Sequence, residues 1–561
     1  MKGSLKKSLA CLLLASTTLI SATACGGGND PNKNKATLYV YSFTSGFGSE
    51  WLTSLIKDYE AKMADVEIDG KKGIHIEPTA VKDSVSGSQM ASRSEVVYFL
   101  EQMDYYELMG GNYIADLTEA ITAENPYDGK TLESKMFADQ KSYLGREVNG
   151  ETHYYAYPHY FTSFGIVYDI ELFDSKGYYF ADGYSTSGAL QDMFVGQEDW
   201  EKSAGPDGEK GTDDDGLPTT YEEFLLLCDY IATIGNDNPL IWAGQYRDSY
   251  LTHFINALAA DYEGLTQMRL NFAFDGEATN LGKIENGAFV KDATPTAITG
   301  ENGYELARQA GKYYAMDFYG DLYAKNYINS NDTKKTLYSD TYSHLKAQED
   351  FLKKTGTKRN AMLLDGSWWQ MEATSTFNIM GKTNPANSKK NRQLGWMPLP
   401  KQSAEKVGEK SVMYDIMYPL CVMKSGVPKD SWEYKYALDF IQFANSDEQL
   451  AKFTKVTGCT KALNYSLTEA QEGELSYFGK EFYKAYKASD IVFPYDNNLL
   501  FANNQRTFQE LDYNSTGSPL YKSTAYTTCF VKAVEKGVTP ETYFSGMHDY
   551  FKELTIWKKA K

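Results

Sequence analysis

Two adjacent tryptophans beside a carboxylate are the residues of this chain best suited to binding chemistry. Asp365, Trp368 and Trp369 lie in the stretch AMLLDGSWW, directly after an apolar run. Sugar rings present apolar C–H faces and rims of hydroxyl groups, so their sites need flat aromatic rings with directional polar partners. We therefore expect at least one of the two tryptophans to contact a carbohydrate. The alternative is that both pack in a hydrophobic core.

Other aromatic and polar residues stand where the chain leaves a predicted strand or passes Pro158. In parallel α/β sheets, ligands bind beyond the carboxyl ends of the strands, which makes such residues candidates. A lone His is more often structural, however, and a cluster of Asn is more often a turn. The further candidates for ligand contacts are Phe43, Ser45, Glu101, Gln102, His159, Tyr160, Trp242, Tyr246 and Asn497.

An acidic, glycine-rich stretch, GPDGEKGTDDDG, spans residues 205–216. Carboxylates at alternating positions of such a loop can wrap oxygen ligands around calcium. The loop is not an EF-hand, because Thr212 stands where that motif requires Gly and Pro218 where it requires Glu. The sequence leaves two alternatives, a structural calcium site or a solvated acidic loop, and no other cofactor is expected. The candidate ligands are Asp207, Glu209, Asp213 and Asp215.

The motifs of common enzyme classes are absent from the sequence. None of the six His forms HExxH, no GxSxG occurs, and the nearest P-loop match, residues 276–283, has one residue too many. GFGSEW nearly matches GxGxxG, but Trp51 stands where the third glycine is needed for helix–strand packing. A glycoside hydrolase needs only two carboxylates, so it stays an alternative. The net charge of −19 argues against a nucleic-acid partner.

The first 24 residues have the features of a secretion signal. Residues 1–7 carry three Lys, and residues 8–20 form an apolar core too short to span a bilayer as an ordinary helix. The small residues before Cys25 resemble a bacterial lipobox, in which the Cys becomes the acylated amino terminus, although Ala22 departs from the favoured Leu. Residues 25–35 are then predicted to form a flexible tether. No other apolar run of about 18 residues occurs, so we expect attachment to the membrane through lipid only.

The stretch YYAYPHYFTSFGIVYDIELF, residues 154–173, predicts a crossover between two units. Pro158 disfavours helix, and residues 165–168 have the composition of a buried strand. Two units also agree with the length of 561 residues, which exceeds what one hydrophobic core serves. Before the crossover, the order of strand, helix and strand predicts parallel pairing. The predicted strands are residues 37–43, 73–77 and 95–100, and the predicted helix is residues 51–63.

A second crossover is predicted at LGWMPLP, residues 394–400. The strand at 418–423 and the helix at 432–444 would then belong to the first unit, and residues 452–458 would lead back to the second. The predicted division is residues 36–157 plus about 400–450 for the first lobe, and residues 158–399 plus about 451–561 for the second lobe.

Several blocks in one order resemble the extracellular solute-binding proteins of bacterial ATP-driven importers, in particular the sugar-binding group related to maltose-binding protein. The blocks are TLYVYSF, EVVYFLEQ with ADLT, YAYPHYFTSFGIVYDIELF, PTTYEEF, AMLLDGSWW, GWMPLP and ALDFIQFANSDEQLAKFTKVTG. The resemblance covers most of residues 36–460. It implies an α/β fold with two lobes of the type II binding-protein kind, each a mixed sheet flanked by helices, joined by multiple hinge crossovers. It also implies a carbohydrate in the cleft, with Trp368 supplying a ring, and a protein that is not an enzyme.

The resemblance completes the functional hypothesis. The chain is expected to be a monomeric, lipid-anchored protein on the outer face of the cytoplasmic membrane, which captures a sugar and delivers it to the permease of an ATP-driven importer. Binding of a peptide or another non-sugar solute on the same scaffold is the remaining alternative. The four Cys of the mature domain are too few for a disulfide scaffold and contain no CxxC for zinc. A bridge from Cys459 to Cys529 is left open, whereas Cys421 is expected to be free because a bridge between lobes would oppose closure.

Overall fold

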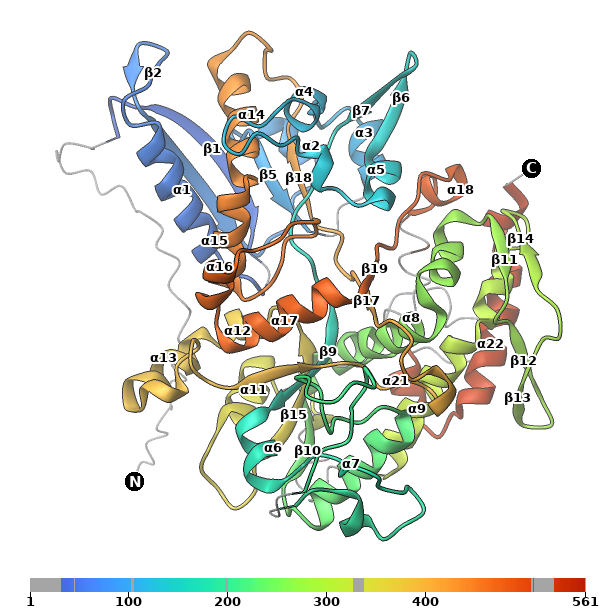
Figure 1. Ribbon diagram of the computed structural model, residues 1–561. Coiled ribbons are helices and arrows are strands. Elements are labelled where there is room, and N and C mark those ends of the chain that lie inside the picture. Colours follow the sequence, from blue (N-terminus) through green and yellow to red (C-terminus); the bar gives the residue numbers. More distant parts are fainter. Residues whose placement is uncertain are drawn as a thin grey trace, which may run out of the picture.

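The computed structural model describes residues 32–44, 46–101, 105–196, 200–325, 337–505, 508 and 529–559. The secretion signal, Cys25, Ser45 and Gln102 lie outside the described residues. The described chain forms two α/β lobes, one above the other in Figure 1, and a smaller side unit at the right of that view. None of the helices in these ranges is both long enough and apolar enough to cross a bilayer.

The first lobe is built on a five-stranded sheet with the order β4-β1-β5-β18-β8. Strand β1 pairs in parallel with β4 and β5, as the strand–helix–strand order predicts, and β18 runs antiparallel between β5 and β8. Two segments far apart in the sequence therefore complete one sheet. The strands are β1 (Ala36–Phe43), β4 (Ile74–Val81), β5 (Val97–Leu100), β8 (Tyr157–Pro158) and β18 (Leu420–Met423).

Helices pack around the sheet of the first lobe. The helix α1 buries Trp51, Leu52, Leu55 and Tyr59, which recur at the spacing that places them on one helical face. Two hairpins, β2–β3 and β6–β7, extend from this lobe. The helices are α1 (Glu50–Lys62), α2 (Gly87–Ser92), α3 (Tyr105–Gly110), α4 (Thr118–Thr122), α5 (Ala138–Leu144), α14 (Trp432–Ala444) and α15 (Asp447–Thr457). The hairpin strands are β2 (Glu67–Ile68), β3 (Lys71–Lys72), β6 (Gly145–Val148) and β7 (Glu151–Tyr154).

The second lobe is built on a four-stranded sheet with the order β10-β15-β9-β16. Its strands β10 and β15 are parallel, and β9 runs antiparallel to both of its neighbours. Every residue of β9 is buried, which agrees with the apolar composition of the strand before Asp169. The strands are β9 (Phe164–Asp169), β10 (Asn238–Trp242), β15 (Asn360–Gly366) and β16 (Leu394–Met397). The helices are α6 (Ile170–Lys176), α7 (Tyr221–Thr233), α9 (Ala310–Lys325), α11 (His344–Leu352), α12 (Trp369–Glu372), α13 (Thr374–Thr383) and α17 (Tyr477–Ala488).

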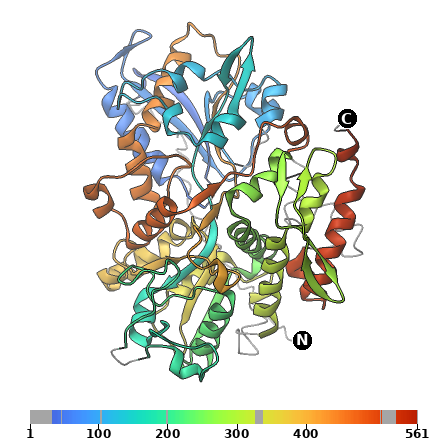
Figure 2. The ribbon, with the colours of Figure 1, turned by 45° about the vertical axis from the view of Figure 1, so that its right-hand side comes forward.

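The long segment α8 (Arg247–Ala273) connects the second lobe to the side unit. Gly264 interrupts its helical geometry with φ 72°, a left-handed conformation that suits Gly because it has no Cβ. Figure 2 shows the side unit beside the second lobe, with β12 and β13 projecting from it. Its elements are β11 (Gly276–Ala278), β12 (Gly282–Glu285), β13 (Ala288–Lys291), β14 (Thr296–Ile298), α18 (Leu499–Ala502), α21 (Phe530–Val534) and α22 (Pro540–Glu553).

Three crossovers between the lobes lie side by side and are hydrogen-bonded to one another. His159 N donates to Pro419 O at 3.0 Å, and Phe161 N donates to Thr460 O at 3.0 Å. These bonds join the segment after β8, the segment before β18 and the segment after α15. Close to them, β17 (Val412–Tyr414) pairs in parallel with β19 (Asp490–Val492). The expectation of multiple crossovers is confirmed.

One expected crossover lies later in the chain than the sequence indicated. Residues 452–458 do not lead back to the second lobe, because α15 continues to Thr457 and packs on α1 of the first lobe. Lys452 Nζ donates to Asp58 Oδ2 of α1 at 2.7 Å. The return begins at Gly458, whose φ of 72° ends the helix. Cys228, Cys421, Cys459 and Cys529 are all buried, free thiols.

Candidate functional site between the lobes

The ring of Trp368 forms a direct contact between the two lobes. Trp368 follows the carboxyl end of β15 and is only 4% exposed. A methyl group built on Gly46, in the loop between β1 and α1, would lie 2.2 Å from Cδ1 of Trp368. The backbone of the first lobe therefore rests on this ring, at the carboxyl ends of strands from both sheets.

Further aromatic rings continue from Trp368 along the second lobe. Tyr250, on α8, lies 6.0 Å from Trp368 between ring centroids and 5.3 Å from Phe164. Tyr246 lies 5.6 Å from Tyr250 and 5.5 Å from His344. Tyr246 is 39% exposed, so the outer end of this aromatic row is open to solvent.

The first lobe contributes a polar pair and two aromatic rings near the same boundary. The hydroxyl of Tyr160 donates to Glu101 Oε1 at 2.5 Å. The ring of Tyr160 packs on that of Phe47, the residue that follows Gly46, with 4.4 Å between the ring centroids. Phe43 is half-buried at the carboxyl end of β1. Phe43, Glu101 and Tyr160 thus lie close to the ends of β1, β5 and β8, and their contact with a ligand stays a prediction.

A buried carboxyl pair lies beneath Trp368. Gln348 Nε2 donates to Asp365 Oδ2 at 3.1 Å and to Glu372 Oε2 at 2.9 Å. Burial raises the pKa of Glu372 to about 7, while Gln348 and Lys82 of the first lobe act in the opposite direction. Burial, followed by the charge of Glu372, raises the pKa of Asp365 well above its ordinary value. Asp365 therefore supports the turn before Trp368 from inside the lobe and is not exposed to a ligand.

His159 lies in the core of the first lobe, which corrects the expectation that it lines the cleft. Its side chain is 1% exposed, and its ring packs 4.9 Å from Trp51 and 4.7 Å from Phe99. Its Nδ1 lies 2.9 Å from Nζ of Lys461. Tyr160, the next residue, is also buried, with 2% of its surface exposed.

Three other candidates also lie away from the interlobe contact. Trp242 is buried in the second lobe, where Nε1 donates to Leu337 O at 3.2 Å. Trp369 is fully buried, and its nearest rings include Phe478 at 5.4 Å. Asn497 is exposed in the turn before α18. The positions of these residues favour structural roles, and of the two adjacent tryptophans only Trp368 reaches the boundary between the lobes.

The acidic loop uses its carboxylates mainly to hold its own backbone. Asp207 Oδ1 accepts from Glu209 N at 2.8 Å, Asp215 Oδ2 accepts from Gly211 N at 2.8 Å, and Asp213 pairs with Lys484 of α17. Glu209 is exposed. Across the described ranges, no three His, Cys, Asp or Glu residues are placed to hold a metal ion. Calcium binding by this loop stays a prediction.

Several residues at the boundary were not found from the sequence: Gly46, Lys82, Tyr250, His344 and Glu372. Tyr250 carried a usable signal, because it lies one helical turn after Tyr246 and shares its face. In the sequence, Gly46 is notable only as the first glycine of the near match to GxGxxG. No local pattern links Gly46 to Trp368, since the contact depends on how the lobes meet.

Two α/β lobes joined by adjacent crossovers, with an aromatic contact between them, define the two-lobe fold of periplasmic binding proteins. No family model matches the sequence, and no curated protein matches it either. Solved structures do match, at low sequence identity.

Three solved structures illustrate the likeness. A chitin oligosaccharide binding protein is 13% identical over 94% of this chain and 100% of its own, with a TM-score of 0.55. The GacH receptor of Streptomyces glaucescens, solved unliganded and with acarbose, is 13% identical over the same shares, with a TM-score of 0.51. A cyclic α-maltosyl-1,6-maltose binding protein from Arthrobacter globiformis is 11% identical over the same shares, with a TM-score of 0.50. These matches confirm the fold expected from the sequence.

Proposed function

We propose that this protein is a monomeric binding protein that captures a carbohydrate between its lobes and passes it to the permease of an ATP-driven importer. The observation that carries the proposal is the aromatic row from Trp368 to Tyr246, which meets the first lobe at Gly46. Flat rings at a closing boundary suit the C–H faces of a sugar, and nearby polar groups suit its hydroxyls. The solved structures of the same fold whose names are given above are sugar binders, which supports this choice of ligand.

Ligand binding would shift the equilibrium between the open and the closed form of the protein. A ligand that touches both lobes favours the closed form only by its difference in affinity for the closed and open forms. The three crossovers would absorb the change in backbone dihedral angles between those forms. In this proposal the direct contact between Gly46 and Trp368 is part of the closed form, and the contact would open to admit the ligand.

We also propose that acylation of Cys25 anchors the protein to the outer face of the cytoplasmic membrane. Two acyl chains hold a protein at a bilayer far better than one. Mass spectrometry of the membrane-extracted protein is expected to find a lipid-modified peptide that begins at Cys25, and Cys25→Ala is expected to release the protein into the medium or the periplasm.

Catalysis and non-sugar ligands are the alternatives. A glycoside hydrolase needs two carboxyl groups, and Asp365 and Glu372 form a carboxyl pair beneath Trp368, but the complete burial of Asp365 argues against catalysis by this pair. We expect the purified protein to release no product from any oligosaccharide that it binds. Hydrolysis that is abolished by Glu372→Gln would establish the enzyme instead, and tight peptide binding without a response to sugars would favour the third alternative.

The decisive experiment is thermal unfolding of residues 29–561 against a panel of mono- and oligosaccharides, with and without calcium. A ligand that binds only the native state adds about 2.7 kcal/mol at 100 times its Kd, so the midpoint rises with ligand concentration. We expect one class of glycan to raise the midpoint. A rise with calcium that is lost in Asp213→Asn/Asp215→Asn would place calcium in the acidic loop. If no glycan changes the midpoint, the proposed function is wrong, whatever calcium does.

A further inference from the structure

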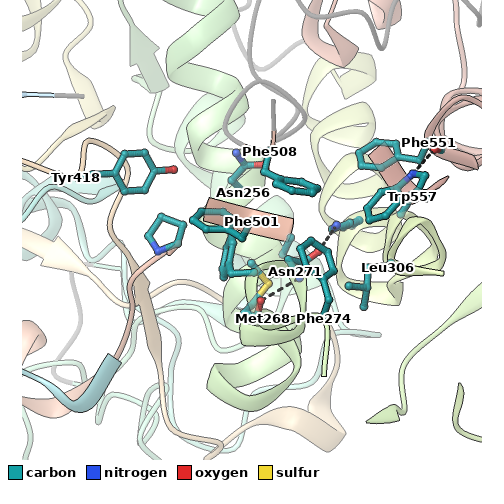
Figure 3. A pocket seen from close by; sticks show the side chains of 16 residues that line it. Asn256, Met268, Asn271, Phe274, Leu306, Tyr418, Phe501, Phe508, Phe551 and Trp557 are labelled. Atoms are coloured by element: carbon teal, nitrogen blue, oxygen red, sulfur yellow. Dashed lines mark hydrogen bonds between the residues drawn. The ribbon is translucent and has the colours of Figure 1, made fainter. Parts of the chain in front are cut away.

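The cavity drawn in Figure 3 is too small for a sugar. Its volume is about 40 Å³, and rings of α8, α18 and the carboxyl-terminal residues surround Asn256. The amide of Asn256 has no hydrogen-bond partner among the described residues, and a polar cavity of this size can hold the water that satisfies it. A sugar in the proposed cleft would instead meet the polar groups beside the aromatic row from Trp368 to Tyr246.

Five side chains of the second lobe contact one another in a ring at the boundary between the lobes. Trp368 leads through Tyr250 and Tyr246 to His344 by the ring contacts given above. His344 Nε2 lies 3.8 Å from Glu372 Oε1. Glu372 stands one helical turn after Trp368, and its N donates to Trp368 O at 3.4 Å. His344 and Glu372 therefore lie next to the aromatic rings that a sugar would contact.

The two carboxyl groups beneath Trp368 differ in how far they are available to a ligand. Asp365 is fully buried, whereas 12% of the Glu372 side chain is exposed. Glu372 Oε2 accepts from Gln348 Nε2 at 2.9 Å, but Oε1 accepts no hydrogen bond from the described residues. A carboxylate oxygen without a donor is unfavourable at a largely buried position. A hydroxyl group that donates to Oε1 would remove this cost.

Glu372 has no positively charged partner within 4 Å in the part of the chain that the structure describes. Burial, followed by the charge of Lys82, lowers the pKa of His344, so the imidazole near Oε1 is neutral at pH 7. Lys82 itself is exposed, follows β4 of the first lobe and acts on Glu372 across the boundary. Because Lys82 already supplies a positive charge there, a neutral hydroxyl group suits Oε1 better than an ammonium group.

We propose that Glu372 contacts the ligand and determines its specificity, with Oε1 accepting a hydrogen bond from one hydroxyl group of a neutral sugar. A carboxylate is a strong acceptor for such a group. The partly exposed ring of Tyr246 offers a flat apolar surface to the C–H face of the same sugar. This inference rests on the proposed function, and it implies that the protein distinguishes sugars by the presence of that hydroxyl group.

The first test compares Glu372→Gln with Glu349→Gln by calorimetry, using the glycan with the largest wild-type response. Gln has the same size as Glu, and its carbonyl oxygen can keep the bond from Gln348, but its NH₂ group replaces the acceptor Oε1. We expect Glu372→Gln to bind about 10- to 100-fold more weakly at pH 8. Glu349 is exposed on the same helix as Gln348 and is paired with Lys346, so Glu349→Gln is expected to bind like the wild type.

The pH dependence of affinity is a second readout, which a purely structural role of Glu372 would not produce. Burial raises the pKa of Glu372 to about 7, and a hydroxyl group that donates to the ionised carboxylate lowers this pKa in the complex. Wild-type affinity is therefore expected to rise about tenfold or more from pH 5 to pH 8, and Glu372→Gln to lose this rise. His344→Gln should keep it. The charged or titratable groups that face Glu372 are Asp365 of β15, His344 of α11, Tyr250 of α8 and Lys82 of the first lobe.

Monodeoxy analogues of that glycan identify the bonded hydroxyl group. One analogue is expected to bind the wild type at least 5-fold more weakly than the parent glycan does, but to bind Glu372→Gln as well as the parent does, because the lost bond is the same. If Glu372→Gln weakens every analogue equally, or binds the parent glycan like the wild type, the inference is wrong and the proposed function stands. Tighter binding of an analogue with an amino group at that position overturns the assignment to a neutral sugar. A wild type that binds no glycan overturns both proposals.

Discussion

The rings of Trp368 and Trp369 have different environments although the residues are adjacent. Trp368 lies between Gly46 of the first lobe and Tyr250 of the second. Trp369 is enclosed by aromatic residues of its own lobe, with Phe351 at 5.7 Å and Phe377 at 5.8 Å. The two rings point in different directions, because consecutive side chains at the start of a helix lie about 100° apart around the helix axis.

This difference predicts different consequences of truncating each ring. Trp369→Ala leaves a large cavity in the core and is expected to cost about 3–5 kcal/mol of unfolding free energy, measured by urea unfolding. Trp368→Ala is expected to cost less stability but to weaken glycan binding at least tenfold in calorimetry, because a ligand-facing ring is lost. Trp368→Phe, which retains a flat ring, should recover most of the affinity. Equal loss of affinity in Trp368→Ala and a folded Trp369→Ala would contradict the assignment.

The hinge crossovers contain a lysine that is enclosed by aromatic residues. Lys461 is 2% exposed, and its Nζ lies 5.6 Å from the ring of Trp51 and 5.1 Å from that of Phe453. Burial lowers its pKa to about 7, with the nearby thiol of Cys421 acting weakly in the opposite direction. Burial and the charge of Lys461 also lower the pKa of His159 well below its usual range.

A lysine with a lowered pKa makes stability depend on pH in a predictable direction. Between pH 7 and 10.5 the unfolded chain binds more protons at this position than the native protein, so the unfolding free energy rises with pH over that window. Lys461→Met should remove this rise and stabilise the protein at pH 7 by at most about 5 kcal/mol. The measurement is urea unfolding at pH 7, 8, 9 and 10.

The exposed Lys429→Met serves as the matched control for that series. It is expected to follow the pH dependence of the wild type. A Lys461→Met variant whose unfolding free energy still rises in parallel with the wild type would show that Lys461 stays charged in the hinge.

Most individual elements were predictable, since local patterns define them. The helix expected at 432–444 is α14, and the strand expected at 37–43 is β1 with one more residue. The helix α7 begins after Thr220, whose hydroxyl accepts from Glu223 N as a cap, and a Thr followed by acidic residues is the pattern typical of such a start. The prediction that the chain returns to the second lobe at 452–458 was wrong for a physical reason. The amphipathic pattern of this segment shows that one of its faces is buried, but not which lobe buries it.

The two lobes meet where the backbone of Gly46 lies against the ring of Trp368. Gly46 is needed there for space rather than for its backbone angles, because its φ is not in the left-handed region. A side chain at this position is therefore compatible with the fold of the first lobe and incompatible with the observed approach to Trp368. This makes Gly46 a selective probe of closure.

Gly46→Ala is expected to weaken glycan binding about tenfold without lowering the unfolding temperature of the ligand-free protein. The added methyl group disfavours the closed form that the ligand needs, and each 1.4 kcal/mol of that penalty is a factor of ten in affinity. Small-angle scattering should show a smaller decrease in radius on addition of ligand than in the wild type. Gly110→Ala adds the same methyl group where no atom lies within 4 Å, and it should behave as wild type. Identical binding by both variants would mean that the bound form keeps Gly46 and Trp368 apart.

The two-lobe organisation and most strands and helices could be predicted from the sequence, and so could the presence of aromatic residues suited to a sugar. The strands and helices follow from local composition and periodicity, which the chain carries wherever it folds, whereas the role of Trp368 came from the family resemblance and stays a prediction. Only the tertiary structure decided that His159, Asp365 and Trp369 are buried, that Gly46 meets Trp368 and that Glu372 keeps one oxygen without a hydrogen bond from the described residues. Burial and contact depend on packing between segments that are hundreds of residues apart in the sequence. The local sequence of a segment does not indicate which distant segment will pack against it.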